Sequence, residues 1–161
     1  MAIHGRTQED CFERFRAHIA KLVSAILTKK NPLLYSGQEG PRQTLSFCHG
    51  DPTTIPIKTK VGTLHFYLSQ CLEAEKVGKS FELHTKEYWY RIQEKAGLKE
   101  TALIRWEYNS ALSSKLPKEC RNHLHLASNL PLSDGSDLDL DKLHIPTGWV
   151  TIEEVLRFLI V

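Results

Sequence analysis

Strict alternation of apolar and polar residues in the middle of the chain constrains the fold more than any other feature. Leu64, Phe66 and Leu68 occupy alternate positions, with His65 and Tyr67 between them. Successive side chains of a β-strand point to opposite faces of a sheet. The segment therefore predicts a strand with one apolar face and one polar face.

Three further segments continue this pattern. The turn Val77–Lys79 leads to a second alternating segment, Phe81–Gln93, and a Gly-containing turn then leads to Thr101–Tyr108. His123–Ala127 is the fourth such segment. Because consecutive strands joined by short turns form an antiparallel meander, we expect an antiparallel β-sheet of four to five strands over residues 63–127.

Helical periodicity occurs near both ends of the chain. Residues 7–29 repeat apolar side chains at three- and four-residue steps, and Thr7 with Asp10 resembles a capping box at the start. Residues 151–161 form a second amphipathic segment, which opens with the Thr151–Glu154 pair. We therefore predict a single α+β domain over all 161 residues, with the N-terminal and the C-terminal helix packed on one face of the sheet.

Two segments have no clear period. Residues 31–60 are rich in Gly and Pro, so we predict an irregular connection with one short strand at Thr44–Cys48. Residues 128–146 are polar and include four aspartates, and we predict an acidic loop there.

Composition excludes several classes of protein. The formal net charge of +2 is too small to indicate nucleic-acid binding by itself. The four cysteines are widely separated and form no CxxC pair, which argues against a zinc ribbon. No apolar run is long enough for a membrane-spanning helix, and the N-terminus has no signal-like apolar segment. We expect a cytoplasmic protein with reduced thiols and no membrane contact.

One short stretch, CRNHLHLAS at residues 120–128, carries the functional signal. Alternate positions hold Arg121, His123 and His125, and leucines occupy the positions between them. In the preceding predicted strand, Arg105 and Glu107 alternate with apolar residues in the same way. If the leucines face the helices, all five polar side chains lie on the opposite face of the sheet.

This set of side chains suits cleavage of RNA through its 2′-hydroxyl group, without a cofactor. His123 and His125 could divide the roles of general acid and general base, because imidazole titrates near neutrality. Arg105 and Arg121 could hold the phosphate and stabilise its developing charge. Glu107 could orient one imidazole. We therefore predict a metal-independent ribonuclease with these five catalytic residues.

Three other interpretations stay open. Arg105 and Glu107 could be an ordinary ion pair on a solvated sheet face. A His-x-His pair on a strand aims both imidazoles the same way, so a metal site completed by Glu107 or His84 is possible. A non-catalytic protein-interaction domain is the third, because the C-terminal helix ends in Leu-Ile-Val, which suggests a longer chain or a partner covering that end.

Three consecutive aromatic residues in the second predicted strand have two possible roles, base stacking and core packing. Tyr88, Trp89 and Tyr90 could stack on nucleic-acid bases, although three aromatic residues in one strand more often belong to a core.

Several motifs together resemble the TumE-like toxin family of bacterial toxin–antitoxin modules. They are the strand Arg105–Asn109, the segment Arg121–Leu126, a Pro-Thr-Gly turn, and a helix that begins Thr151-Ile152-Glu153-Glu154. The resemblance covers residues 63–161, with Glu107 where the family usually has Asp. It implies a growth-inhibiting toxin that acts on RNA and is neutralised by a small cognate antitoxin protein.

Overall fold

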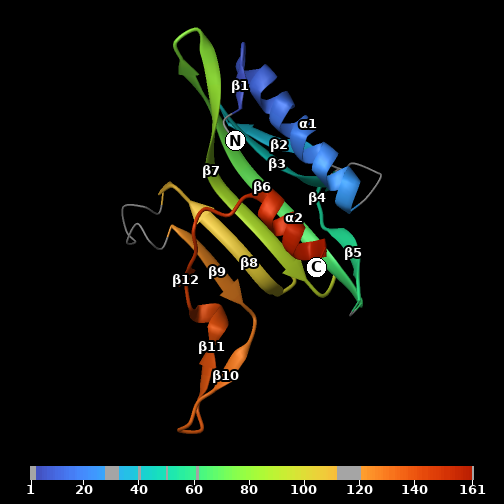
Figure 1. Ribbon diagram of the computed structural model, residues 1–161, viewed down its shortest axis with the longest axis vertical. Helices are drawn as coiled ribbons and strands as arrows, with labels where there is room; N and C mark the ends of the chain where they lie inside the picture. The colour runs from blue at the N-terminus through green and yellow to red at the C-terminus, as the bar shows by residue number, and fades with distance from the viewer. Residues whose placement is uncertain are drawn as a thin grey trace.

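The computed structural model describes residues 3–27, 33–39, 41–49, 51–60, 62–111 and 121–160. In these residues the chain is an α+β protein that combines a large antiparallel sheet with two helices, α1 (Gln8–Ile26) and α2 (Ile152–Ile160). Both helices lie across the same face of the sheet (Figure 1). The predicted fold class is therefore confirmed.

The sheet is larger than the sequence suggested. Its main path in the described residues runs in the order β12-β9-β8-β7-β6-β3-β2, and β1, β4 and β5 pair with β7, β3 and β6. β10 and β11 form a separate hairpin, which extends away from the sheet (Figure 1). The strands are β1 (His4–Gly5), β2 (Leu33–Glu39), β3 (Arg42–His49), β4 (Asp51–Pro52), β5 (Ile55–Thr59), β6 (Gly62–Val77), β7 (Ser80–Gln93), β8 (Ala102–Asn109), β9 (Asn122–Leu126), β10 (Asn129–Pro131), β11 (Asp137–Asp139) and β12 (Ile145–Pro146).

Four predicted strands correspond to β6, β7, β8 and β9, and the predicted short strand Thr44–Cys48 lies within β3. The sheet nevertheless has more strands than the four to five predicted. The predicted irregular connection over residues 31–60 contains β2, β3, β4 and β5. The predicted acidic loop over 128–146 contains β10, β11, β12 and the 3-10 helix η3 (Leu140–Lys142).

β2 and β5 were not predicted because each contains a glycine or a proline, which usually indicates a loop. Here these residues lie at an edge strand and at a bulge, where a sheet accommodates them. Pro56 lies on β5, which pairs with only one described strand, β6. On its unpaired side β5 forms no inter-strand hydrogen bonds with described strands, so the missing N–H of proline is tolerated there. Ile55 and Ile57 on either side of it are buried. Gly37 lies at a register shift of β2, where a bulge accommodates it. The other missed strands are two or three residues long, too short for a visible alternation.

The predicted helix starts are correct. Thr7 caps α1 by accepting a hydrogen bond from the Asp10 amide at 3.1 Å. Thr151 and Glu154 form a reciprocal capping box, with N···O distances of 3.3 Å and 2.7 Å. The predicted final residues of both helices, 28–29 and 161, lie outside the described residues. Neither described helix is both long and apolar enough to cross a membrane.

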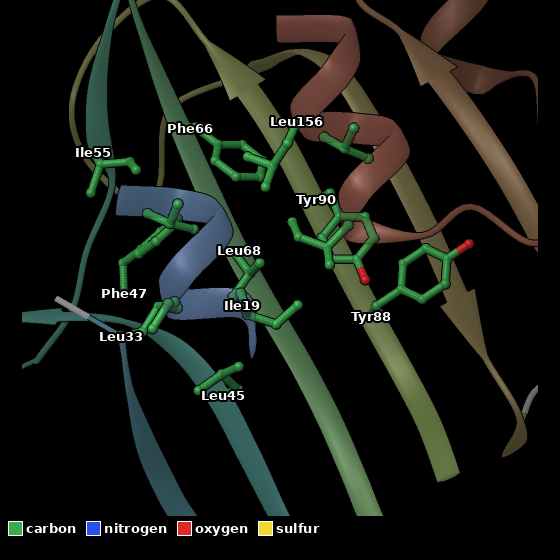
Figure 2. Close-up of a cluster of buried hydrophobic side chains, with 14 of the residues drawn as sticks. Ile19, Leu33, Leu45, Phe47, Ile55, Phe66, Leu68, Tyr88, Tyr90 and Leu156 are labelled. Carbon is green, nitrogen blue, oxygen red and sulfur yellow. The ribbon is translucent and has the colours of Figure 1, made fainter. Parts of the chain in front are cut away.

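The hydrophobic core lies between the helices and one face of the sheet. Ile19 of α1 and Leu156 of α2 pack against Phe66, Leu68 and Tyr90, and all five are at most 1% exposed (Figure 2). Burying a side chain of this size contributes about 1.5–3 kcal/mol. The alternate residues of β6 and β7 consequently face away from the helices.

Candidate functional site

The pairing of β8 with β9 brings four of the five predicted site residues together. Arg105 lies directly opposite His125, and Glu107 lies directly opposite His123. The intervening residues Trp106 and Leu124 face the other way, and Trp106 packs on Phe158 of α2. The polar side chains therefore lie on the face opposite the helices, as the alternation predicted.

The two histidines are not on an open surface, contrary to expectation. His123 and His125 are each 4% exposed, whereas Leu124 and Leu126 are only half-buried. The cause is the segment that follows β9, which turns back through β10, β11 and η3 and then pairs with β9 as β12. This segment covers the two imidazoles, with the Asp141 carbonyl oxygen 2.8 Å from His125 Nδ1.

The returning segment also delivers a third imidazole that the sequence analysis missed. β12 pairs Ile145 with Leu124, so His144 comes beside His125. The centroid of the His144 ring lies 4.6 Å from that of His123 and 4.8 Å from that of His125. No periodicity marks residue 144 in the sequence, because its position depends on a pairing across some twenty residues.

A carboxylate and a guanidinium adjoin these rings. Glu107 Oε2 lies 3.3 Å from His123 Nε2 and 3.9 Å from His125 Nε2. Its other oxygen lies 2.7 Å from Arg105 Nε. Glu107 therefore links the guanidinium to the imidazoles and restrains the ring of His123. We call His123, His125, His144 and Glu107 the imidazole cluster.

Hydrogen bonding fixes the tautomer of His125. Its Nδ1 lies 2.8 Å from the backbone carbonyl oxygen of Asp141. A carbonyl can only accept, so Nδ1 carries the proton and donates it. Nε2 of the neutral ring then has a lone pair, and this buried atom has no hydrogen-bond partner among the described residues. An imidazole held by a backbone carbonyl in this way is oriented as metal-ligating histidines are.

His144 is the exposed member of the cluster, and its environment favours the neutral ring. Desolvation lowers the pKa of His144, and the neighbouring His123 and His125 lower it further. The carboxylate of Glu107 acts in the opposite direction without reversing the shift. A neutral imidazole can bind a metal ion, which a protonated one cannot.

The geometry of the three imidazoles suits a divalent transition-metal ion. One nitrogen from each of His123, His125 and His144 lies within 4.8 Å of the others. Tetrahedral coordination with bonds of about 2.0–2.1 Å puts ligand nitrogens roughly 3.3 Å apart. Side-chain rotation could close this difference. Among the described residues, this is the one such group of three metal-binding side chains.

Two other polar residues from the sequence analysis, Arg121 and His84, form no hydrogen bond or ion pair with the cluster among the described residues. Arg121 precedes β9, and among the described residues its buried Nε has no hydrogen-bond partner. His84 pairs across the sheet with Glu73, and its Nε2 lies 3.9 Å from Glu75. His84 is therefore not the third ligand that the sequence left open.

Most cysteines and aromatic residues have packing roles. Cys11 and Cys48 are buried free thiols, and Cys71 is a partly exposed one. Cys120 lies outside the described residues. Tyr88 and Tyr90 are buried and stack at 4.6 Å, as expected for core residues.

A cavity of about 480 Å³ lies on the helix side of the sheet and contains none of the cluster residues. His18 and Glu153 line it and pair at 3.0 Å. Tyr90 donates to Gln70, which in turn donates to Thr85. Because these polar groups satisfy one another, the cavity has no free catalytic set comparable to the imidazole cluster.

Comparisons with family models, with curated proteins and with solved structures gave no significant match. The resemblance to the TumE-like toxins consequently stays a prediction from the quoted motifs.

Proposed function

We propose that the protein cleaves RNA at the imidazole cluster, as a toxin of the family it resembles, with a divalent transition-metal ion bound by His123, His125 and His144. The observation that supports this most is the free lone pair of His125, buried beside two further imidazoles and one carboxylate. A buried nitrogen without a partner is costly unless a ligand occupies the site.

The chemistry follows from a three-histidine site. A zinc ion held by His123, His125 and His144 would supply a metal-activated base at neutral pH. That base would accept the proton of a ribose 2′-hydroxyl group. The 2′-oxygen then attacks phosphorus, and the 5′-oxygen leaves with a proton from solvent. Glu107 would hold the ligand imidazoles in place, and Arg105 would offset charge on the phosphate.

Metal-independent acid–base catalysis, as predicted from the sequence, is the second candidate. The contact between Glu107 and His123 favours it, because the carboxylate at 3.3 Å orients the imidazole that would act as the acid. His123 would then be the acid and neutral His125 the base, with Arg105 and Arg121 holding the phosphate. This version requires the buried Nε2 of His125 to reach the substrate directly, which the bound-metal version does not.

A cleavage assay with and without metal separates the two candidates. The protein is stripped with a chelator, assayed on total RNA, and assayed again after Zn²⁺ is restored. We expect cleavage that depends on the metal and is absent in the His123→Ala, His125→Ala double variant. His84→Ala is the matched control, since His84 lies outside the cluster. Cleavage that is unchanged in metal-free protein would favour the second candidate, and no cleavage in any form would contradict both.

The biological setting is part of the same proposal. We propose a cytoplasmic toxin whose cognate antitoxin is encoded beside it. Expression of the wild-type chain should arrest bacterial growth, and co-expression of the adjacent gene product should relieve the arrest. Arrest that persists in the double histidine variant would separate toxicity from this site.

A further inference from the structure

We propose that the sheet face opposite the helices binds single-stranded RNA and leads it to the imidazole cluster. The proposal rests on the proposed function for what happens at the cluster, but the binding surface is argued from other residues. These residues are Tyr67, Trp89, Arg91 and Arg121, which we call the docking face.

Strand register aligns the docking face with the cluster. Tyr67, Arg91, Arg105 and His125 lie opposite one another on β6, β7, β8 and β9. The next row runs from Trp89 through Glu107 to His123. Neighbouring strands are about 4.8 Å apart, so the row from Tyr67 to His125 spans roughly 14 Å. This continuous row ends at the proposed cleavage centre.

Each arginine of the docking face has one nitrogen without a hydrogen-bond acceptor among the described residues. Nε of Arg91 and Nε of Arg121 are buried and have no hydrogen-bond partner among the described residues. Elsewhere in the chain, Arg14 and Arg16 pair with neighbouring carboxylates at 2.7 Å. A guanidinium stays charged at every physiological pH. Phosphate oxygens would supply acceptors that these two Nε atoms lack among the described residues.

Aromatic rings on the same face provide surfaces for bases. Trp89 lies between the buried Tyr88 and Tyr90 in sequence, but it faces the other side of the sheet and is only half-buried. Tyr67 is also half-buried, and the Arg91 guanidinium lies 5.6 Å from its ring centroid. Arginine and aromatic side chains interleaved along a strand are the components of single-strand binding surfaces.

These features favour a single strand over a duplex. Base faces can stack on Trp89 or Tyr67 only when they are unpaired, because in a duplex they are stacked on each other. The cleavage step also requires a ribose that can rotate its 2′-hydroxyl group toward the phosphate. Unpaired RNA is therefore the substrate class that this face fits.

Binding is tested with metal-free protein and a fluorescein-labelled oligouridylate of about twelve nucleotides, so that cleavage cannot consume the probe. We expect Trp89→Ala to weaken binding by about five- to 150-fold and Trp89→Phe to retain most of the affinity. Arg91→Ala should reduce the slope of log affinity against log salt by about 0.7. Arg14→Ala and Trp149→Ala, on the helix side of the molecule, are the matched controls.

The outcomes distinguish this proposal from the cleavage proposal. Binding that is lost in the docking-face variants but retained in the controls supports the docking face, whether or not RNA is cleaved. Equal affinity for duplex and single strand, equal loss in the controls, or no binding at all would overturn it. If zinc-loaded protein cleaves RNA and Trp89→Ala leaves KM unchanged, cleavage stands and the docking face is wrong. Circular dichroism verifies that each variant is folded.

Discussion

The two faces of β7 differ in burial and in hydrogen bonding. On the helix side, Tyr88 and Tyr90 are 1% exposed and fully packed. On the other side, the adjacent Trp89 and Arg91 are half-buried, and Arg91 Nε has no partner among the described residues. One strand thus supplies the core with one set of alternate residues and a polar surface with the other. Stability depends on the first set, so the second is available for chemistry.

The cluster on β9 is an intermediate case. His123 and His125 are as buried as core residues, yet Nε2 of His125 has no hydrogen-bond partner among the described residues. Such burial lowers stability unless a ligand compensates for it. The comparison therefore predicts that substitutions on the helix face change folding, whereas substitutions on the other face change binding and catalysis.

The largest expected effect is on folding. Leu68→Ala removes a fully buried side chain from the helix face and should lower the free energy of unfolding by about 2–5 kcal/mol. Tyr67→Ser, one residue away on the other face, should cost less than about 1 kcal/mol. Urea denaturation of both variants measures the difference. Equal losses would show that the two faces are packed alike.

A smaller effect is expected for Glu107→Gln. The carboxylate restrains His123 and adjoins His125, so its loss should weaken zinc affinity by about 10- to 100-fold. The free energy of unfolding of the metal-free chain should change little. Competition with a chromophoric chelator gives the affinity. Unchanged affinity would remove Glu107 from the metal centre.

Tyr88→Phe should have a modest effect on the helix side. The Tyr88 hydroxyl donates to Asn122 Oδ1 at 3.1 Å and lies 3.3 Å from the Val150 amide. Removing it should lower the free energy of unfolding by about 0.5–1.5 kcal/mol. RNA cleavage should stay unchanged. A large loss of cleavage would mean that the two faces are coupled through β9.

The smallest effect is a pH dependence of the metal-free chain. The folded state lowers the pKa of His144 from 6.5, so the unfolded chain binds more protons near that pH. Stability is fully present above pH 6.5 and falls as the pH drops through the lowered folded pKa. Desolvation is the largest cause of this lowered pKa; the neighbouring His123, His125 and Arg105 lower it further, and Glu107 raises it. Between about pH 5 and about pH 7.5, the free energy of unfolding of His144→Asn, measured by urea denaturation, should vary less with pH than that of the wild type. An equal slope in both chains would contradict this prediction.

Local pattern was sufficient for much of the fold. Alternation identified β6 to β9 and placed Arg105, Glu107, His123 and His125 on one face, and capping pairs located the helix starts. The strands that contain Pro56 and Gly37 were missed because a strand accepts these residues only at a sheet edge or a bulge. Edges and bulges are defined by tertiary structure and cannot be read from local pattern. His144 and the burial of the cluster were missed for the same reason, since both depend on β12 returning to β9.

Calorimetric titration of Zn²⁺ into the metal-free chain tests the central claim most directly, namely that imidazoles from β9 and the segment before β12 form one metal centre. The wild-type chain and His84→Ala should each bind one ion per chain, whereas His144→Ala should bind it far more weakly or not at all. Binding by His144→Ala that equals the wild type, or no binding by the wild type, would contradict the account.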